Sequence, residues 1–368
     1  MITISEIIKY LEQLFPKHLA YEKDPIGLQI GTANRPLTKA IVTLDLTEAV
    51  VYEAIESKAN LIIAHHPFIY QPMATINTNT PKGKIIELCL KNDISVYAMH
   101  TNYDIAPNGM NDCLAEMLGL TQTKPLIPTK REEYSKLAIY VPDTHATAVR
   151  NAMATSGVGQ IANYSHCIFT TEGTGYFKPL LGSTPYYGQE NEIEQVKEVK
   201  VEGVVKSDLL SQVLEEVKLV HPYEEIAYDF YSLNVPTLGI QFGLGRIGQV
   251  SQPGIIVSDY IKKIKKSLNL SHVRFVGNLD KKIKTVAIIG GSGSSYASVV
   301  KAKKADLFIT GDVGYHDAQD ALDIGLNILD IGHHAESIMK QHVSMLLNEK
   351  FGEKFTASAI MTDPFKFI

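Results

Sequence analysis

The chain has 368 residues, more than one compact core usually holds, so we expect two or three structural units. Apolar residues make up 45% and charged residues 20%, which excludes wholesale disorder. The 35 Lys and Arg against 40 Asp and Glu leave a formal charge of −5, which argues against a nucleic-acid partner. Three scattered cysteines argue against a disulfide framework and favour a reducing, cytoplasmic location.

The N-terminus predicts an amphipathic helix. Thr3 and Glu6 have the spacing of a capping box at the start of an apolar period. The acidic residues of this stretch are not typical of a signal or transit peptide. Along the chain no run reaches the roughly 18 apolar residues of a membrane span, so we expect no membrane association.

Two blocks of the chain alternate short β-branched runs with stretches of helical period, which is the pattern of βαβ units. In the first block we expect strands at 40–46, 61–64 and 94–99 and helices at 47–58, 84–91 and 108–118. In the second we expect strands at 285–289, 306–310 and 326–331 and helices beginning near Ser292, Gly314 and His333. An offset of 246 carries Lys58–Ala64 onto the similar Lys304–Thr310. We therefore predict an α/β fold with two related βαβ halves, although any two βαβ units share some of this spacing.

Between the blocks the pattern changes. We expect strands at 136–141, 196–205 and 227–232, helices at 144–155 and 208–220, and a Gly- and Pro-rich middle at 173–188. This β-α-β/β-α-β order predicts an inserted ferredoxin-like α+β domain. The halves at 1–127 and 236–368 would then form one discontinuous domain around the insert at 128–235.

Histidines and carboxylates follow three predicted strands at the point where each strand ends. His65 and His66 come directly after the second strand, His100 and Asp104 after the third, and His333 and Glu336 after the last. Ligands gather at the carboxyl ends of strands in α/β sheets, so these segments are expected to converge. One histidine at a strand end is usually an ordinary polar residue, but three such groups favour a metal site.

The spacing within these groups favours a centre of two ions. His333 and Glu336 are three residues apart and share a helical face, whereas consecutive His65 and His66 point in different directions. Imidazole and carboxylate without thiolate suit Zn, Fe or Mn, and Asp104 and Glu336 are the natural bridging ligands. A closed set of ligands would be structural, and only an open coordination position makes an enzyme.

Two further segments supply candidates for the same site. The turn at 289–296 is rich in glycine, and its backbone N–H groups could bind a phosphate of a substrate at Gly291, Ser292 and Gly293. The segment after Thr310 corresponds to the His65 strand end and supplies Asp312 and His316 as proton-transfer candidates, beside His100, and Tyr315 as a substrate contact. Asp24 could add a hydrogen bond. The alternatives are that tight turns need glycine anyway, that Asp312 caps a helix and that His316 lies on a solvated face.

Six motifs together resemble the GTP cyclohydrolase 1 type 2 family, also called NIF-three-like proteins. They are 26–31, 64–67, 100–104, 290–293, 310–316 and 332–336, in this order. The insert, through 163–165, 173–177 and 221–225, resembles the PII-like or CutA-like domain of longer bacterial members.

The resemblance implies a two-metal site, often holding zinc, in a toroidal homohexamer. The ligands it implies are His65, His66, Asp104, His333 and Glu336, with His100 behind them. Shorter relatives place the last carboxylate four residues after the first histidine of its motif, and here the interval is three. This leaves His333 and His334 both open as the ligand, and we choose His333.

The implied reaction is opening of the imidazole ring of GTP at C8, with release of formate. Two other classes remain open. One is another metal-dependent hydrolase, such as a phosphoesterase, which would use the same ligands. The other is a non-catalytic metal-binding regulator or scaffold.

Overall fold

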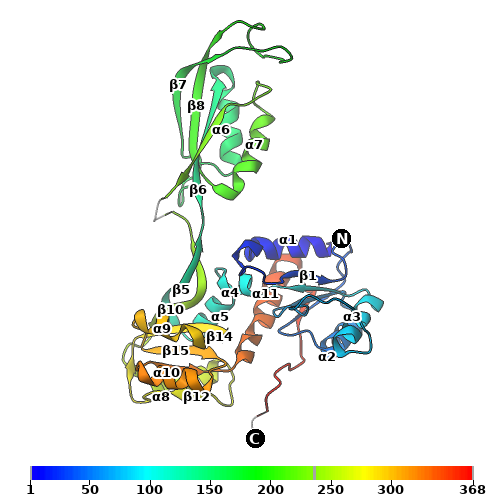
Figure 1. Ribbon diagram of the computed structural model, residues 1–368, viewed down its shortest axis with the longest axis vertical. Coiled ribbons are helices and arrows are strands. Elements are labelled where there is room, and N and C mark those ends of the chain that lie inside the picture. The colour runs from blue at the N-terminus through cyan, green and yellow to red at the C-terminus, as the bar shows by residue number, and fades with distance from the viewer. Residues whose placement is uncertain (1, 235–237, 367–368) are drawn as a thin grey trace. The chain divides into compact units, whose positions relative to one another are not determined.

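The computed structural model describes residues 2–234 and 238–366 and forms two units (Figure 1). The two-sheet unit consists of Met1–Lys130 and Phe242–Ile368, and the insert unit of Arg131–Gln241. The first boundary lies just beyond the expected 127/128, because β5 (Leu120–Arg131) runs through that position. The expected boundary at 235/236 lies outside the described residues.

The first sheet of the two-sheet unit has the strand order β1-β4-β3-β2-β17. Strands β2, β3, β4 and β17 run parallel and β1 antiparallel. Helices α1 and α11 pack on one face and α2 and α3 on the other, so successive residues of β2 enter different apolar clusters. The bounds are β1 (Gly27–Ile30), β2 (Ala40–Thr43), β3 (Leu61–Ala64), β4 (Ser95–Ala98), β17 (Phe355–Ala357), α1 (Ile4–Leu14), α2 (Glu48–Glu56), α3 (Pro81–Lys91) and α11 (Met339–Phe351). The predicted capping box of Thr3 and Glu6 begins α1.

The second sheet has the order β12-β16-β15-β14-β10-β5, and a small sheet pairs β11 with β13. Strands β14, β15 and β16 run parallel, and β12 and β10 run antiparallel to their neighbours β16 and β14. One apolar cluster joins residues of both large sheets. The bounds are β10 (Gln241–Val250), β11 (Ile255–Ile256), β12 (Arg274–Val276), β13 (Lys282–Ile283), β14 (Thr285–Ser292), β15 (Leu307–Gly311), β16 (Asn327–Asp330), α4 (Thr101–Ile105), α5 (Met110–Met117), α8 (Val257–Ser267), α9 (Ala297–Ala302) and α10 (Tyr315–Asp323).

The two sheets repeat one arrangement with the offset seen in the sequence. Ala40 pairs with Leu61 between β2 and β3, and Val286 pairs with Leu307 between β14 and β15, which is the same register shifted by 246. Each half also places an antiparallel strand beside its third parallel strand, β1 beside β4 and β12 beside β16. The first sheet therefore presents the carboxyl ends of four adjacent parallel strands and the second sheet those of three.

A buried arginine joins the second sheet to the segment that follows β4. Arg246 on β10 binds both carboxylate oxygens of Asp112, at 2.5 and 2.7 Å, and donates to the carbonyls of Gly243, Gly245 and Ala106. Its side chain is 4% exposed. The guanidinium thus has all its donors paired, the condition under which a buried charge is tolerated.

Replacing Arg246 by Met is expected to lower the free energy of unfolding of the two-sheet unit by about 3–5 kcal/mol, because it leaves several buried acceptors without a donor. Native-state hydrogen exchange of the amides of β14 and β15 measures this loss. The matched control is Arg35→Met, which breaks the exposed ion pair with Asp93 and should cost no more than about 1 kcal/mol. Equal exchange in the two variants would contradict the role of Arg246.

The insert unit contains a four-stranded sheet of order β7-β8-β6-β9, all antiparallel, with α6 and α7 packed on one face. The bounds are β6 (Tyr134–Pro142), α6 (Ala146–Thr155), β7 (Ile168–Phe177), β8 (Glu194–Lys206), α7 (Leu210–Lys218) and β9 (Tyr228–Leu233). Strand β7 begins before the Gly-rich middle and occupies its first residues. Its threonines and glycines, exposed on both faces, hide the alternation that marks a strand. Within the described residues, no helix has both the length and the apolarity to cross a membrane.

Candidate metal centre

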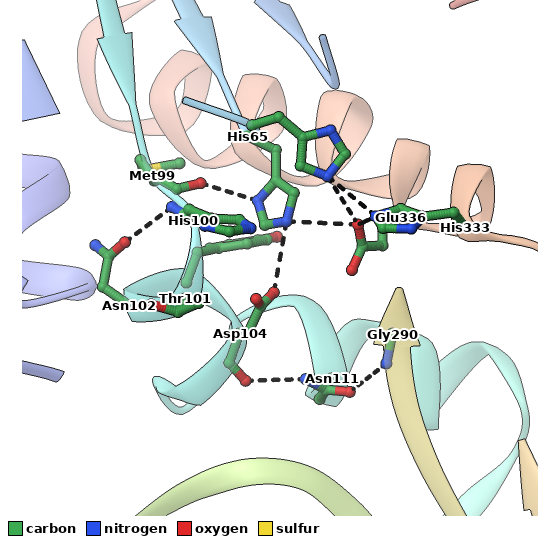
Figure 2. Close-up of polar contacts among 12 residues, drawn as sticks. His65, Met99, His100, Thr101, Asn102, Asp104, Asn111, Gly290, His333 and Glu336 are labelled. Carbon is green, nitrogen blue, oxygen red and sulfur yellow. Dashed lines mark hydrogen bonds and ion pairs between the residues drawn. The ribbon is translucent and has the colours of Figure 1, made fainter. Parts of the chain in front are cut away.

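The metal-site candidates lie at neighbouring strand ends of the two-sheet unit (Figure 2). His65 and His66 follow β3 directly, and Asp104 lies on α4, the short helix that begins after β4. His333 and Glu336 lie on a 3-10 turn, His333–Ile338, which follows β16. In a 3-10 turn residues three apart lie above one another, so both side chains point the same way. The long-range pairing of the halves therefore brings the ligands of both sheets to one place.

Glu336 stands at the centre of the cluster. Its Oε2 atom lies 3.6 Å from the Nε2 atom of His65, 3.3 Å from that of His66 and 3.2 Å from that of His333. Asp104 approaches His65 from the other side, with 3.6 Å between Oδ1 and Nε2. The Nε2 atoms of His66 and His333 are 3.2 Å apart. All five predicted ligands are thus brought together.

Each histidine of the cluster is oriented through its other ring nitrogen. The Nδ1 atom of His65 donates to the carbonyl of Met99 at 2.9 Å. In the other three histidines the Nδ1 atom donates to a carboxylate. The distances are 2.7 Å from His66 to Asp45, 2.6 Å from His333 to Asp312 and 2.9 Å from His100 to Asp24. With Nδ1 used as a donor, Nε2 is left as the free lone pair, and this is how proteins prepare histidine for a metal.

Three buried atoms of this cluster have no hydrogen-bond partner within the described residues. They are Nε2 of His65, Oδ1 of Asp104 and Oε2 of Glu336. A buried polar atom without a partner costs roughly 1–3 kcal/mol, and more when it is charged. Two groups of side chains, His65 with Asp104 and Glu336, and His66 with His333 and Glu336, have ligand atoms within 4.8 Å of one another. The donor types and the unpaired atoms fit a divalent metal.

The pKa shifts of the three histidines also fit a site for a divalent metal. Burial lowers the pKa of His65 to about 3, so its ring is neutral. Burial also disfavours charge on His66, but Asp45 and Glu336 outweigh it and raise the pKa of His66 to about 10. Contact with Glu336 raises the pKa of His333 to about 9. Without metal, the last two rings hold protons, which an incoming ion displaces.

The two carboxylates of the cluster are shifted in opposite directions. Burial, and next the charge of Glu336, raise the pKa of Asp104 well above its usual value. Burial alone would raise the pKa of Glu336 too, but the protonated rings of His333 and His66 outweigh it and hold this pKa below its usual value. One carboxylate therefore keeps its charge beside the histidines, as a ligand for a cation must.

The glycine-rich end of β14 lies directly against Glu336. A Cβ atom on Gly291 would come within 2.5 Å of Oε1 of Glu336, and the φ angle of Gly291 is +62°. A Cβ atom on Gly311 would come within 2.9 Å of the backbone of His333. Both positions need glycine because the ligand-bearing turn packs on their backbone. From the sequence, Gly291 was a candidate for binding a phosphate of the substrate, and this packing against Glu336 gives a second reason for glycine there.

Asn111 ties the two halves together beneath the cluster (Figure 2). Its side chain, fully buried on α5, donates to the backbone carbonyl of Asp104 at 3.0 Å and accepts from the backbone N–H of Gly290 at 2.9 Å. One amide thus links a ligand of the first half to the turn that supports Glu336. This contact sets the spacing between the ligands of the two halves.

Comparison with known proteins identifies the family of this chain. The model of the family Duf34/NIF3 (NGG1p interacting factor 3) matches residues 2–364. The chain belongs to the DUF34/NIF3 family. This confirms the resemblance that the six motifs indicate. A relative from Bacillus subtilis (strain 168), named GTP cyclohydrolase 1 type 2 homolog, is 45% identical over 99% of this chain and 98% of its own length.

Solved structures agree with this assignment. A Bacillus cereus protein related to NIF3 superimposes with a TM-score of 0.91 at 45% identity, covering 100% of this chain and 99% of that one. A Staphylococcus aureus protein superimposes with a TM-score of 0.79 at 34% identity, again over 100% of this chain and 99% of that one. The α/β architecture with several sheets is therefore that of NIF3 proteins.

The structure of this DUF34/NIF3 protein also places the remaining predicted residues. His100 belongs to the cluster, because its ligand atom groups with those of His65 and His66. Asp24 holds His100, and Asp312 holds His333 rather than capping a helix.

Other candidates are not brought into the cluster. Tyr315 is 75% exposed on α10, and His316 is exposed with its Nδ1 atom 3.3 Å from Oε1 of Gln319. Ser292 is exposed, and a Cβ atom on Gly293 would meet the hydroxyl of Thr310 rather than open space. His334 is half-buried beside the cluster. Burial lowers its pKa, and the charges of Asp363, Lys340 and Asp45 also influence this pKa.

Sequence reasoning missed three residues of this DUF34/NIF3 site. Asp45 orients His66, Asn111 joins the halves, and Thr362 donates to Asp45. Asp45 had a usable signal, since it follows β2 at a strand end as the ligands do. Asn111 and Thr362 had none, because each acts through a contact distant in sequence.

Proposed function

We propose that the cluster binds two divalent metal ions, with zinc as the expected metal. His65 with Asp104 would hold one ion and His66 with His333 the other, and Glu336 would bridge them because its Oε2 atom faces all three histidines. The observation that carries this proposal is the set of three buried and unpaired ligand atoms. Nitrogen and oxygen ligands without thiolate are suited to zinc, iron or manganese.

We propose that the centre is hydrolytic. A bound divalent ion supplies a water molecule whose pKa is lowered toward neutrality. His100 is the expected proton acceptor, because Asp24 occupies its Nδ1 atom and leaves Nε2 free. Its side chain is 22% exposed, whereas that of His65 is fully buried, so His100 lies where a substrate can reach it.

The substrate that we propose is GTP. The support is the name shared by relatives of high identity, GTP cyclohydrolase 1 type 2 homolog. In this reaction water adds at C8 of the guanine, the imidazole ring opens, and a second water releases formate. Proton transfers at each addition need a group such as Nε2 of His100 beside the reacting carbon.

Incubation of the zinc-loaded protein with GTP tests this function. We expect formate and a ring-opened triphosphate, identified by mass spectrometry, and no product from protein stripped of metal by a chelator. Zinc-loaded protein that leaves GTP intact would overturn the proposal. A panel of phosphodiesters assayed in parallel separates a phosphoesterase from a protein that binds metal without catalysis.

We further propose that the insert unit is a ferredoxin-like domain of the PII or CutA type, and that the chain assembles as a homohexameric ring in the cytoplasm. The support for the domain is its element order, β6-α6-β7-β8-α7-β9, with sheet order β7-β8-β6-β9. Sedimentation equilibrium measures the assembly, and a monomer at micromolar concentration would contradict the ring.

A further inference from the structure

The C-terminal segment of the chain is carried to the metal centre by the topology of the first sheet. Strand β17 pairs in parallel with β2, with Ala357 opposite Val42. The amide of Ser358 continues this ladder by donating to the carbonyl of Val42 at 2.8 Å. Because parallel strands end at the same edge, the residues after β17 emerge where the ligands gather.

This segment, Ser358–Asp363, is held on both sides although it has no regular secondary structure. Lys340, which is 8% exposed, donates from Nζ to the carbonyl of Ser358 at 3.0 Å. Glu53 on α2 accepts from the amide of Ala359 at 2.7 Å and from the hydroxyl of Ser358. A buried cation and a carboxylate thus fix the path of the backbone toward the site.

Near its end, the segment contacts the carboxylate of Asp45, which orients the candidate ligand His66. The hydroxyl of Thr362 donates to Oδ2 of Asp45 at 2.7 Å, while Oδ1 of Asp45 accepts from Nδ1 of His66 at 2.7 Å. With both oxygens bound, the carboxylate has one orientation, and the imidazole that it holds points Nε2 at the cluster.

A second part of the cluster has the same construction. Asp24 accepts from the amide of Thr101 at 3.1 Å and from its hydroxyl with Oδ2, and it holds Nδ1 of His100 with Oδ1. There the threonine directly follows the histidine in the chain. For His66 the threonine comes from the other end of the chain, 317 residues from Asp45. The repeated arrangement of threonine, carboxylate and histidine argues that Thr362 has a function beyond anchoring the terminus.

We propose that Ser358–Asp363 contributes to metal binding. Thr362 fixes the carboxylate of Asp45, so that the Nε2 atom of His66 points at its metal ion. Thr362 is a positioning residue, because it acts through Asp45 and touches no ligand itself. The inference rests on the metal binding proposed above, and it does not depend on which substrate the centre uses.

The test compares Thr362→Val with Thr362→Ser in the full-length protein. Valine keeps the shape and removes the donor, so we expect one of the two ions to bind about 10-fold more weakly and the other to be unaffected. Serine keeps the hydroxyl and should restore the affinity. Competition with a chromophoric chelator measures both constants, and the visible spectrum of the cobalt-loaded protein reports the geometry around His66.

Two controls separate positioning from a loss of structure. Thr356→Val changes an exposed threonine of β17 and should leave both affinities unchanged. In a background that already carries Asp45→Ala, Thr362→Val should have no further effect, since the two residues act in one chain of contacts. The melting temperature of the metal-free protein shows whether the variant has lost stability.

The inference is overturned if Thr362→Val binds both ions as the unchanged protein does, if both ions weaken equally, or if serine is no better than valine. Absence of metal binding by the unchanged protein would instead overturn the proposed centre. Metal binding without GTP turnover would overturn only the proposed reaction. The three failures are therefore distinguishable.

Discussion

Replacing Glu336 by Gln is expected to abolish binding of both proposed metal ions. The carboxylate is the one group whose oxygen faces His65, His66 and His333 together, and an amide of the same shape carries no charge to offset two cations. Loss of an orienting residue around a metal typically weakens binding 10–100-fold, so loss of a shared ligand should weaken it by at least about 100-fold. Elemental analysis after gel filtration gives the metal content per chain.

A comparison of single variants makes this prediction specific to the cluster. His65→Ala should also lower the metal content, by removing a ligand of one ion. His145→Ala is the matched control, because this histidine lies in the insert unit with its Nδ1 atom 2.9 Å from the hydroxyl of Thr144. Equal loss of metal in all three variants would refute the assignment of the site.

Replacing His100 by Gln is expected to leave the metal content unchanged and to lower kcat by about 10²–10⁴, the usual contribution of a general acid or base. The reason is that Asp24 binds the Nδ1 atom of His100, which leaves Nε2 to accept a proton, and that the side chain is 22% exposed. Steady-state kinetics with GTP and elemental analysis of the same samples measure the two quantities.

The variant Asp24→Asn sharpens the role of His100. It keeps an acceptor for the Nδ1 atom of His100 but removes the charge, so kcat should fall by less than in His100→Gln, by about 10-fold. Loss of metal in His100→Gln would show that this residue is a ligand. Unchanged turnover would show that the proton is accepted elsewhere.

The candidate ligands could be proposed from the sequence because each has a local signal. His65, His66 and Asp104 follow short apolar runs that are typical of buried parallel strands, and the geometry of α/β sheets places such residues at one edge. His333 was preferred to His334 from a spacing of three residues. The structure confirms that His333 joins Glu336, through a 3-10 turn rather than the first turn of an α-helix.

The glycine-rich segment at 289–296 shows a contact that the local pattern could not predict. Gly291 has the features of an anion-binding loop, and a turn of this kind can bind a phosphate. Its backbone also lies against the carboxylate of Glu336, which comes from the segment after another strand. Only the packing of β14 against the turn after β16 reveals why glycine is needed there.

The sequence by itself determined the two α/β halves, their offset and the five candidate ligands that follow strand ends, because hydrophobic period and strand-end chemistry are properties of short segments. The tertiary structure alone decided what orients those ligands. Asn111 reaches Gly290 in the other half, and Thr362 reaches Asp45 across almost the whole chain. Such contacts depend on strand order and register, which bring together residues that share no local pattern, and so the support of the site could be seen only after folding.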